Sequence, residues 1–227
     1  MRKGDERKTE ILQVSEKLFL TKGYEATSIQ DILDVLHSSK GGFYHHFVSK
    51  DAVLNTLCVQ HAEQAAERAA ALLETLEETA PMTRLNALMR SFLPLQQEEL
   101  DFMAMLLPTL DRQESVSVRV SYQEALAEAF RPLLEKEIAA ARSQGVLFSS
   151  VPEVIRPVLV LLNQCWTEAA LYLTRCLHGQ QTYEPSALLN VLACYRRGIE
   201  VLLDAPWGTV ELLQLQEWNA MAESILK

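Results

Sequence analysis

Side chains that can donate hydrogen bonds to anionic or base oxygens gather in one short segment, residues 39–50. Lys40 carries an ammonium group that can donate to O6 or N7 of guanine, and His45 can contact either a base or a phosphate. Gly41 and Gly42 would let the backbone approach such a partner closely. Because most exposed lysines are only solvated surface charges, this chemistry depends on the element that presents them.

The spacing of reactive residues does not favour other kinds of site. The adjacent His45 and His46 would point about 100° apart on a helix, so they cannot readily bind one metal ion together. We interpret His46 as a partly buried structural residue. The sequence shows no catalytic set of nucleophile and base, no Walker sequence and no dinucleotide fingerprint. We therefore expect a protein that is not an enzyme, with no catalytic residues, no metal and no cofactor.

The cysteines and the hydropathy pattern indicate which cellular compartment to expect. Four cysteines are scattered through apolar stretches without a C-x-x-C pair, which is typical of free thiols in a reducing environment. No uncharged apolar run reaches the roughly 18 to 20 residues that a membrane span needs. We expect a cytoplasmic protein with no membrane partner.

The distribution of charge matters more than the net charge of −9. Residues 1–56 carry eight basic and eight acidic side chains, whereas the rest of the chain carries 13 basic and 22 acidic ones. The acidity therefore belongs to the C-terminal part. Since a local basic footprint decides nucleic-acid binding, the acidic total is only weak evidence against it.

Two helices are predicted in the first 36 residues. Apolar residues at helical spacing run from residue 11 to residue 19, Lys22 supplies a cation in the last turn, and Gly23 supplies a C-cap. Thr27 is predicted to open a second helix of about two turns through a capping box, its hydroxyl accepting from the Gln30 N–H.

Two further helices should follow after a tight turn. Residues 39–46 place Phe43 and Phe47 four positions apart, on one face of a third short helix. Residues 49–51 open a fourth helix that runs without Gly or Pro to about residue 78. The second and third helices together form a helix-turn-helix, whose second helix lies in the DNA major groove.

These segments resemble the signature of the TetR family of bacterial transcriptional regulators. The resemblance covers the N-terminal quarter and rests on residues 19–32, 39–47 and 49–51, in the family's order and spacing. The chain departs from the pattern in the turn, where His37 and Ser38 replace a glycine and an apolar residue. A position that often has positive φ is then filled by His, which tolerates this at some cost.

The resemblance implies an all-α fold with a helix-turn-helix DNA-binding domain at residues 1–50 and an effector-binding and dimerisation domain at residues 51–227. It implies phosphate contacts from Tyr44 and Lys50, with Thr27 and Ser28 helping, and base contacts from the third helix. Arg2 and Lys3 could add a basic arm. The predicted DNA-binding residues are Thr27, Ser28, Ser39, Lys40, Gly41, Gly42, Tyr44, His45 and Lys50.

The C-terminal part is predicted to be helical throughout. Two of its helices, residues 158–177 and 188–203, are long and apolar, and the resemblance implies that they pair with a second copy in a homodimer. Ordinary core burial accounts for them equally well. Glycines and prolines divide this part into helices at about 82–97, 99–111, 114–144, 152–178, 185–203 and 209–226.

The family analogy also places a small-molecule effector in this part. Its predicted pocket residues are Phe92, Met103, Tyr122, Asn163 and Trp166. Residues of these types at helical spacing are more often core residues. Glu168 would suit a cationic ligand, although an internal salt bridge is the stronger expectation.

The expected function is that of a repressor that binds a palindromic, double-stranded operator as a dimer and is released by its effector. The sign of regulation rests on analogy alone. The alternative is a dimeric protein-interaction adaptor on the same fold, without sequence-specific DNA binding.

Overall fold

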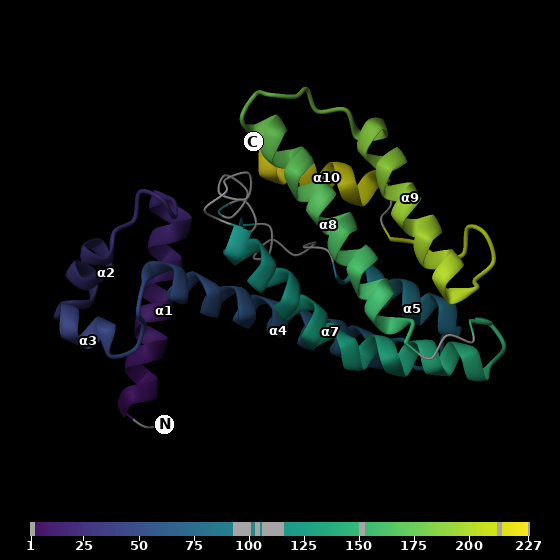
Figure 1. Cartoon of the computed structure of the whole chain (residues 1–227), viewed down its shortest axis with the longest axis horizontal. Helices are drawn as coiled ribbons and strands as arrows, with labels where there is room; N and C mark the ends of the chain where they lie inside the picture. Colours follow the sequence, from purple (N-terminus) through teal and green to yellow (C-terminus); the bar gives the residue numbers. More distant parts are fainter. Residues whose placement is uncertain are drawn as a thin grey trace.

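The computed structural model describes residues 3–92, 101–102, 105, 116–149, 153–212 and 215–226. Every regular element within these ranges is an α-helix, which confirms the all-α fold class. None of the helices in the described ranges combines the length and apolar character needed to cross a bilayer. Helices α1 to α3 form one end of the molecule, and α4 leads from that end to the remaining helices (Figure 1).

The N-terminal end confirms the predicted order of four helices. They are α1 (Lys3–Lys22), α2 (Ile29–Leu36), α3 (Lys40–Tyr44) and α4 (Lys50–Thr75). Helix α3 is shorter than the predicted 39–46, because Ser39 is its N-cap and residues 45–46 form a turn. A fully buried cluster holds the four helices together, and its members include Phe19 of α1, Ile32 of α2, Phe43 of α3 and Leu54 of α4.

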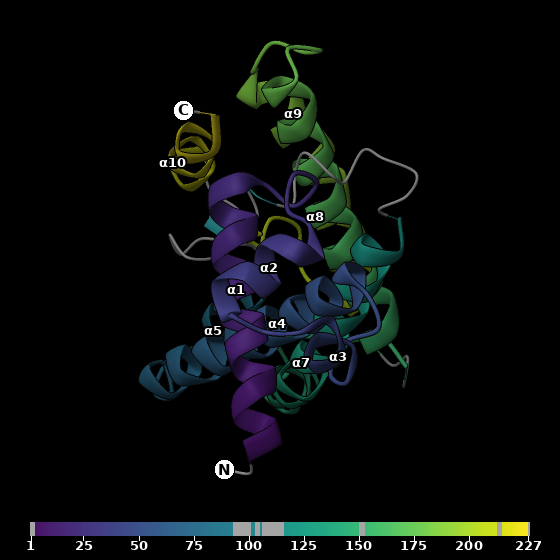
Figure 2. The same ribbon diagram turned by 90° about the vertical axis from the view of Figure 1, so that its left-hand side faces the viewer.

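The larger part contains α5 (Pro81–Arg90), α7 (Val116–Ser143), α8 (Ile155–Leu177), α9 (Pro185–Leu203) and α10 (Leu215–Leu226). Helices α4 and α7 lie side by side, α8 pairs with α9, and α10 packs against both of them. When the molecule is viewed from the end formed by α1 to α3, these three helices lie in front of the larger group (Figure 2). Most of the predicted helix at 99–111, and predicted pocket residue Met103, lie outside the described residues.

A buried ion pair fixes the far half of α4 against α5 and α7. Arg84 of α5 donates two hydrogen bonds, at 2.7 and 2.6 Å, to the carboxylate of Glu137 on α7, whose residue exposure is only 1%. The same guanidinium donates to the Leu73 carbonyl of α4 at 2.7 Å. One side chain therefore orients three helices.

The last helix begins later than predicted, at Leu215 instead of residue 209. Tertiary hydrogen bonds hold the preceding residues in an irregular path: Asn86 of α5 bonds the Thr209 carbonyl and the Glu211 N–H, at 2.8 and 3.1 Å. Buried Glu200 accepts from the Gly208 N–H at 2.8 Å. The prediction was wrong because Asn86, which holds this path, lies 123 and 125 positions away from Thr209 and Glu211 in the sequence.

Candidate nucleic-acid interface

The start of α2 corrects the predicted capping box. Ser28, not Thr27, is the N-cap; its hydroxyl accepts from the Asp31 N–H at 3.1 Å, and the Asp31 carboxylate accepts from the Ser28 N–H at 2.7 Å. Thr27 is 1% exposed, and its hydroxyl donates to the Gly23 carbonyl at 2.8 Å. The prediction named the wrong pair because either of two adjacent hydroxyl residues fits the motif. In this structure the Thr27 hydroxyl is used inside the protein.

A salt bridge ties this cap to the end of α1. Lys22, in the last turn of α1, donates to the Asp31 carboxylate at 2.8 Å. The hydrogen bond from Lys22, followed by those from Ser28, holds the pKa of Asp31 well below its ordinary value of 3.8. The direction of α2 is thereby set by the helix before it.

The turn between α2 and α3 adopts the conformation that the family pattern implies. His37 has φ 47° and ψ 45°, so the position with positive φ is filled by histidine. The following Ser38 donates its N–H to the Leu33 carbonyl at 3.0 Å, which closes the end of α2. A Cβ atom on Gly42 would lie 3.0 Å from the Ser38 hydroxyl oxygen, so the first turn of α3 favours glycine there.

Helix α3 has one buried and one exposed side. Phe43 is fully buried, with its ring centroid 6.1 Å from that of Phe47. Ser39 caps the helix by accepting from the Gly42 N–H at 3.3 Å. The exposed side is formed by four of the predicted DNA-binding residues: Lys40, Gly41, Tyr44 and His45. Tyr44 keeps 51% of its surface exposed, although it follows the buried Phe43 directly.

Lys50 has a structural role that its motif position does not reveal. Its ammonium donates to the carbonyls of Tyr24 and Thr27, at 2.8 and 2.9 Å, and lies 4.2 Å from the centroid of the Tyr24 ring. Two of its three N–H donors therefore hold the start of α4 against the loop between α1 and α2. One donor remains for a partner outside the protein.

Asp51 completes this connection. It accepts a hydrogen bond from the buried hydroxyl of Tyr24, and burial followed by this carboxylate raises the pKa of Tyr24 well above its ordinary value of 10.0. Tyr24 therefore stays protonated and continues to donate. No local pattern predicts this contact, because 27 positions separate the two residues.

The predicted effector residues fall into two groups. Phe92 is buried against Phe130, with ring centroids 5.0 Å apart, and acts as a core residue here. Tyr122 of α7 and Trp166 of α8 meet edge to face, with centroids 6.3 Å apart. Asn163, one turn before Trp166, donates to the Gln123 carbonyl of α7 at 3.2 Å. The structure thus brings three of the predicted residues together where α7 meets α8.

Within the part of the chain that the structure describes, two buried polar atoms at this junction have no hydrogen-bond partner: Oδ1 of Asn163, an acceptor, and Nε1 of Trp166, a donor. A buried polar atom without a partner costs about 1–3 kcal/mol, so such atoms need a physical explanation. Glu168, two residues after Trp166, accepts from the Tyr195 hydroxyl at 3.3 Å. Within the described residues, no cationic side chain pairs with Glu168, so the structure gives no support to the predicted salt bridge.

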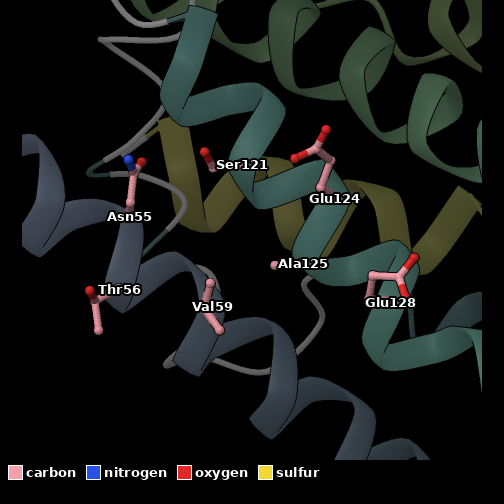
Figure 3. A pocket seen from close by; sticks show the side chains of 7 residues that line it. All are labelled: Asn55, Thr56, Val59, Ser121, Glu124, Ala125 and Glu128. Carbon is pink, nitrogen blue, oxygen red and sulfur yellow. The ribbon is translucent and has the colours of Figure 1, made fainter.

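An open groove lies between α4 and α7. It has a volume of about 490 Å³, and polar side chains from both helices face it (Figure 3). Asn55 of α4 contributes a buried amide oxygen that has no hydrogen-bond partner among the described residues. Glu128 on the α7 side is paired with Arg131 at 2.9 Å. The groove is shallow and was not predicted from the sequence.

A second groove, of about 600 Å³, lies between α8 and α9 and is almost wholly apolar. Gly198 lets the two helices approach, since a Cβ there would lie 3.0 Å from a methyl carbon of Leu161. Val160 and Val201 line the groove and are 57% and 63% exposed. The described residues of this chain therefore leave an apolar face of α8 and α9 uncovered.

Comparison with known proteins agrees with the N-terminal geometry. The family model described as bacterial regulatory proteins, tetR family, matches residues 11–57. The uncharacterized HTH-type transcriptional regulator YerO of Bacillus subtilis is 46% identical over 54 residues, 24% of this chain and 19% of YerO. The HTH-type transcriptional repressor KstR2 of Mycolicibacterium smegmatis is 32% identical over 87 residues, 38% of this chain and 42% of KstR2.

These matches span less than half the length of the curated relatives, so the likeness in sequence concerns the N-terminal end. The fold as a whole is similar to that of a TetR-family transcriptional regulator from Pectobacterium atrosepticum. That similarity covers 91% of this chain and 99% of the other, with a TM-score of 0.56 and 20% sequence identity. The N-terminal end is thus similar in sequence to bacterial regulatory proteins of the tetR family, and the fold as a whole is similar to that of a TetR-family regulator.

Proposed function

We propose that this protein is a transcriptional repressor that binds a palindromic DNA operator as a homodimer through α3. The observation that carries the proposal is the division of α3 into a buried and an exposed side. Phe43 holds the helix, while Lys40, Tyr44 and His45 remain exposed with donors suited to base edges and phosphates. In this proposal residues 1–50 form the DNA-binding domain and 51–227 the sensing domain, with α4 contributing to both.

Selection of bound sequences from a pool of random duplexes tests the proposal. We expect the purified protein to enrich a palindrome whose half-sites lie about 34 Å apart, the spacing of successive major grooves. Tyr44→Ala should weaken binding to that site. If a folded dimer enriches no sequence at low salt, the adaptor function replaces the repressor.

The role of Lys50 needs a separate experiment, because two of its donors are already used. The salt dependence of operator affinity separates the two possibilities. A phosphate contact predicts that Lys50→Ala lowers the slope of log K against log salt by about 1. A purely structural role predicts weaker binding with an unchanged slope. Lys136→Ala, on the exposed surface of α7, provides a control with the same change of charge.

We propose that the apolar face of α8 and α9 pairs with its copy in a second chain. A palindromic operator needs two α3 helices related by a twofold axis, and a self-complementary face provides one. The exposed Val160 and Val201 support this assignment. Sedimentation equilibrium should show a dimer that Val160→Glu combined with Val201→Glu converts to monomers. A dimer that survives both substitutions would contradict the assignment.

We further propose that the effector binds where α7 meets α8. The donor of Trp166 and the acceptor of Asn163, both without partners, suit a ligand group that can accept and donate, such as a hydroxyl or carboxamide. The ring of Tyr122 beside Trp166 would contact an apolar body. Effector and operator should weaken each other's binding by the same factor, because such coupling is reciprocal.

A further inference from the structure

We propose that His61 is a positioning residue that connects the core of the sensing part with α1. Through His61, this core would determine the position of α1 and of the DNA-binding end that α1 supports. This inference rests on the proposed function, and it names the contacts that connect the effector site with α3. The contacts run from Glu16 of α1 through His61 of α4 to Phe102, Tyr122 and Trp166. We refer to these five side chains as the aromatic relay.

The first contact of the aromatic relay joins α1, in the N-terminal end, directly to α4. Nε2 of His61 lies 2.6 Å from the Glu16 carboxylate, and their side chains are 14% and 30% exposed. A carboxylate only accepts hydrogen bonds, so Nε2 must carry the proton and donate it. His61 lies nearly three turns into α4, beyond the segment that Lys50 and Asp51 attach to the α1–α2 loop.

The remaining contacts lead into the sensing part without interruption. The His61 ring stacks on the Phe102 ring, with centroids 3.7 Å apart and planes inclined by 16°. Phe102 is only 2% exposed and meets Tyr122 edge to face at 6.2 Å. Tyr122 in turn meets Trp166 at 6.3 Å. Each pair of neighbouring rings therefore lies within the range of about 4.5–7 Å over which aromatic pairs interact, or closer.

Because these rings are closely packed, a displacement of one ring is passed on to the next. A buried ring such as Phe102 has little free space, so a displacement of Tyr122 must be taken up by its neighbours. The imidazole of His61 covers one face of Phe102 and cannot follow such a displacement without changing its short bond to Glu16. Hydrogen bonds weaken steeply as they lengthen or bend, so a small shift is enough.

At its other end, α1 braces the two helices of the helix-turn-helix. Arg7 donates to the Leu36 carbonyl, the last residue of α2, at 3.3 Å. The ammonium of Lys8 lies 5.8 Å from the centroid of the Phe47 ring, just beyond α3. A change at Glu16 thus reaches α2 and α3 through one continuous helix. The relay explains how occupation of the α7–α8 junction alters DNA binding.

Amide hydrogen exchange of the full-length protein tests the relay without a known effector. Tyr122→Leu removes the ring that Phe102 and Trp166 contact, and His61→Leu removes the bond to Glu16. We expect each to speed exchange in residues 14–20 of α1 by about threefold or more, as coupling between distant sites predicts. The double variant should exchange no faster than the faster single variant, because both changes break the same chain of contacts.

Two matched substitutions serve as controls. Tyr183→Leu removes a tyrosine packed near Tyr172, and His178→Leu removes an exposed histidine at the end of α8. Neither should alter exchange in α1. If Tyr122→Leu leaves α1 unchanged, or speeds α1 and α9 equally through general destabilisation, the relay is overturned. Additive effects in the double variant would overturn it as well.

Operator binding by the same variants separates the relay from the proposed function. If the wild type binds a selected operator but α1 does not respond to Tyr122→Leu, the repressor stands and the relay falls. If α1 responds but no duplex is enriched, the relay stands as a connection between domains and the repressor falls.

Discussion

The two ends of the molecule begin their helices in different ways. At the N-terminal end, α2, α3 and α4 each start at a serine whose hydroxyl accepts from the first turn: Ser28, Ser39 and Ser49. In the larger C-terminal part, α5, α8 and α9 start at Ala80, Val154 and Glu184, without any side-chain cap. The helices of the first set are capped by local side chains, whereas those of the second set lack such caps.

The difference suits the roles that we propose. A recognition helix must be held in one orientation, and local caps with short turns achieve this within about fifty residues. A sensing part must respond to a ligand, and helices held by tertiary contacts can shift when those contacts change. The unpaired Trp166 and Asn163 atoms lie in this second region.

The largest effect that we predict concerns the buried ion pair between Arg84 and Glu137, which holds helices together in the part without side-chain caps. Glu137→Ala leaves the Arg84 guanidinium without its carboxylate partner, and loss of one partner from a buried pair costs about 3–5 kcal/mol. Urea unfolding should show this loss. Glu135→Ala, an exposed neighbour on α7, should change stability by about 0.5 kcal/mol or less. Similar losses for the two variants would mean that the pair does not hold the helices.

A smaller effect is expected when the serine cap of α4 is removed and a serine cap is added to α9. Ser49→Ala should lower the free energy of unfolding by about 1 kcal/mol, because the Ala52 N–H loses its acceptor. Glu184→Ser should raise it by about 0.5 kcal/mol, since α9 gains the cap that it lacks. Thermal unfolding measures both changes. If Ser49→Ala does not lower the free energy of unfolding, or Glu184→Ser does not raise it, local capping does not distinguish the two regions.

The smallest effect concerns the pH dependence of the α2 cap. Since the pKa of Asp31 is lowered in the folded protein, its carboxylate adds stability above pH 3.8 that is lost as the pH falls further. Asp31→Asn removes this contribution. The difference in stability between wild type and variant should therefore be present at pH 6 and shrink towards pH 3. Urea unfolding at the two pH values gives the result; a constant difference would contradict the role of the salt bridge with Lys22.

The same comparison explains which features could be predicted from the sequence. The four N-terminal helices and the limits of α9 follow from apolar spacing and from Gly, Pro and Ser at the ends. The bond between Glu16 and His61 spans 45 positions, and that between Asn86 and Thr209 spans 123. No local pattern encodes such pairs. The sequence therefore indicated the exposed residues of α3 but not the bonds of Lys50, nor the relay.

The most direct test of the central claim compares two lysines on the selected operator. Fluorescence anisotropy would measure the affinity for this duplex and for one with a scrambled sequence, using wild type, Lys40→Ala and Lys136→Ala. If α3 reads base edges, Lys40→Ala should lower the ratio of the two affinities about tenfold or more. Lys136→Ala should leave the ratio unchanged. Equal ratios for all three proteins, or a wild type that does not discriminate between the duplexes, would contradict DNA recognition by α3.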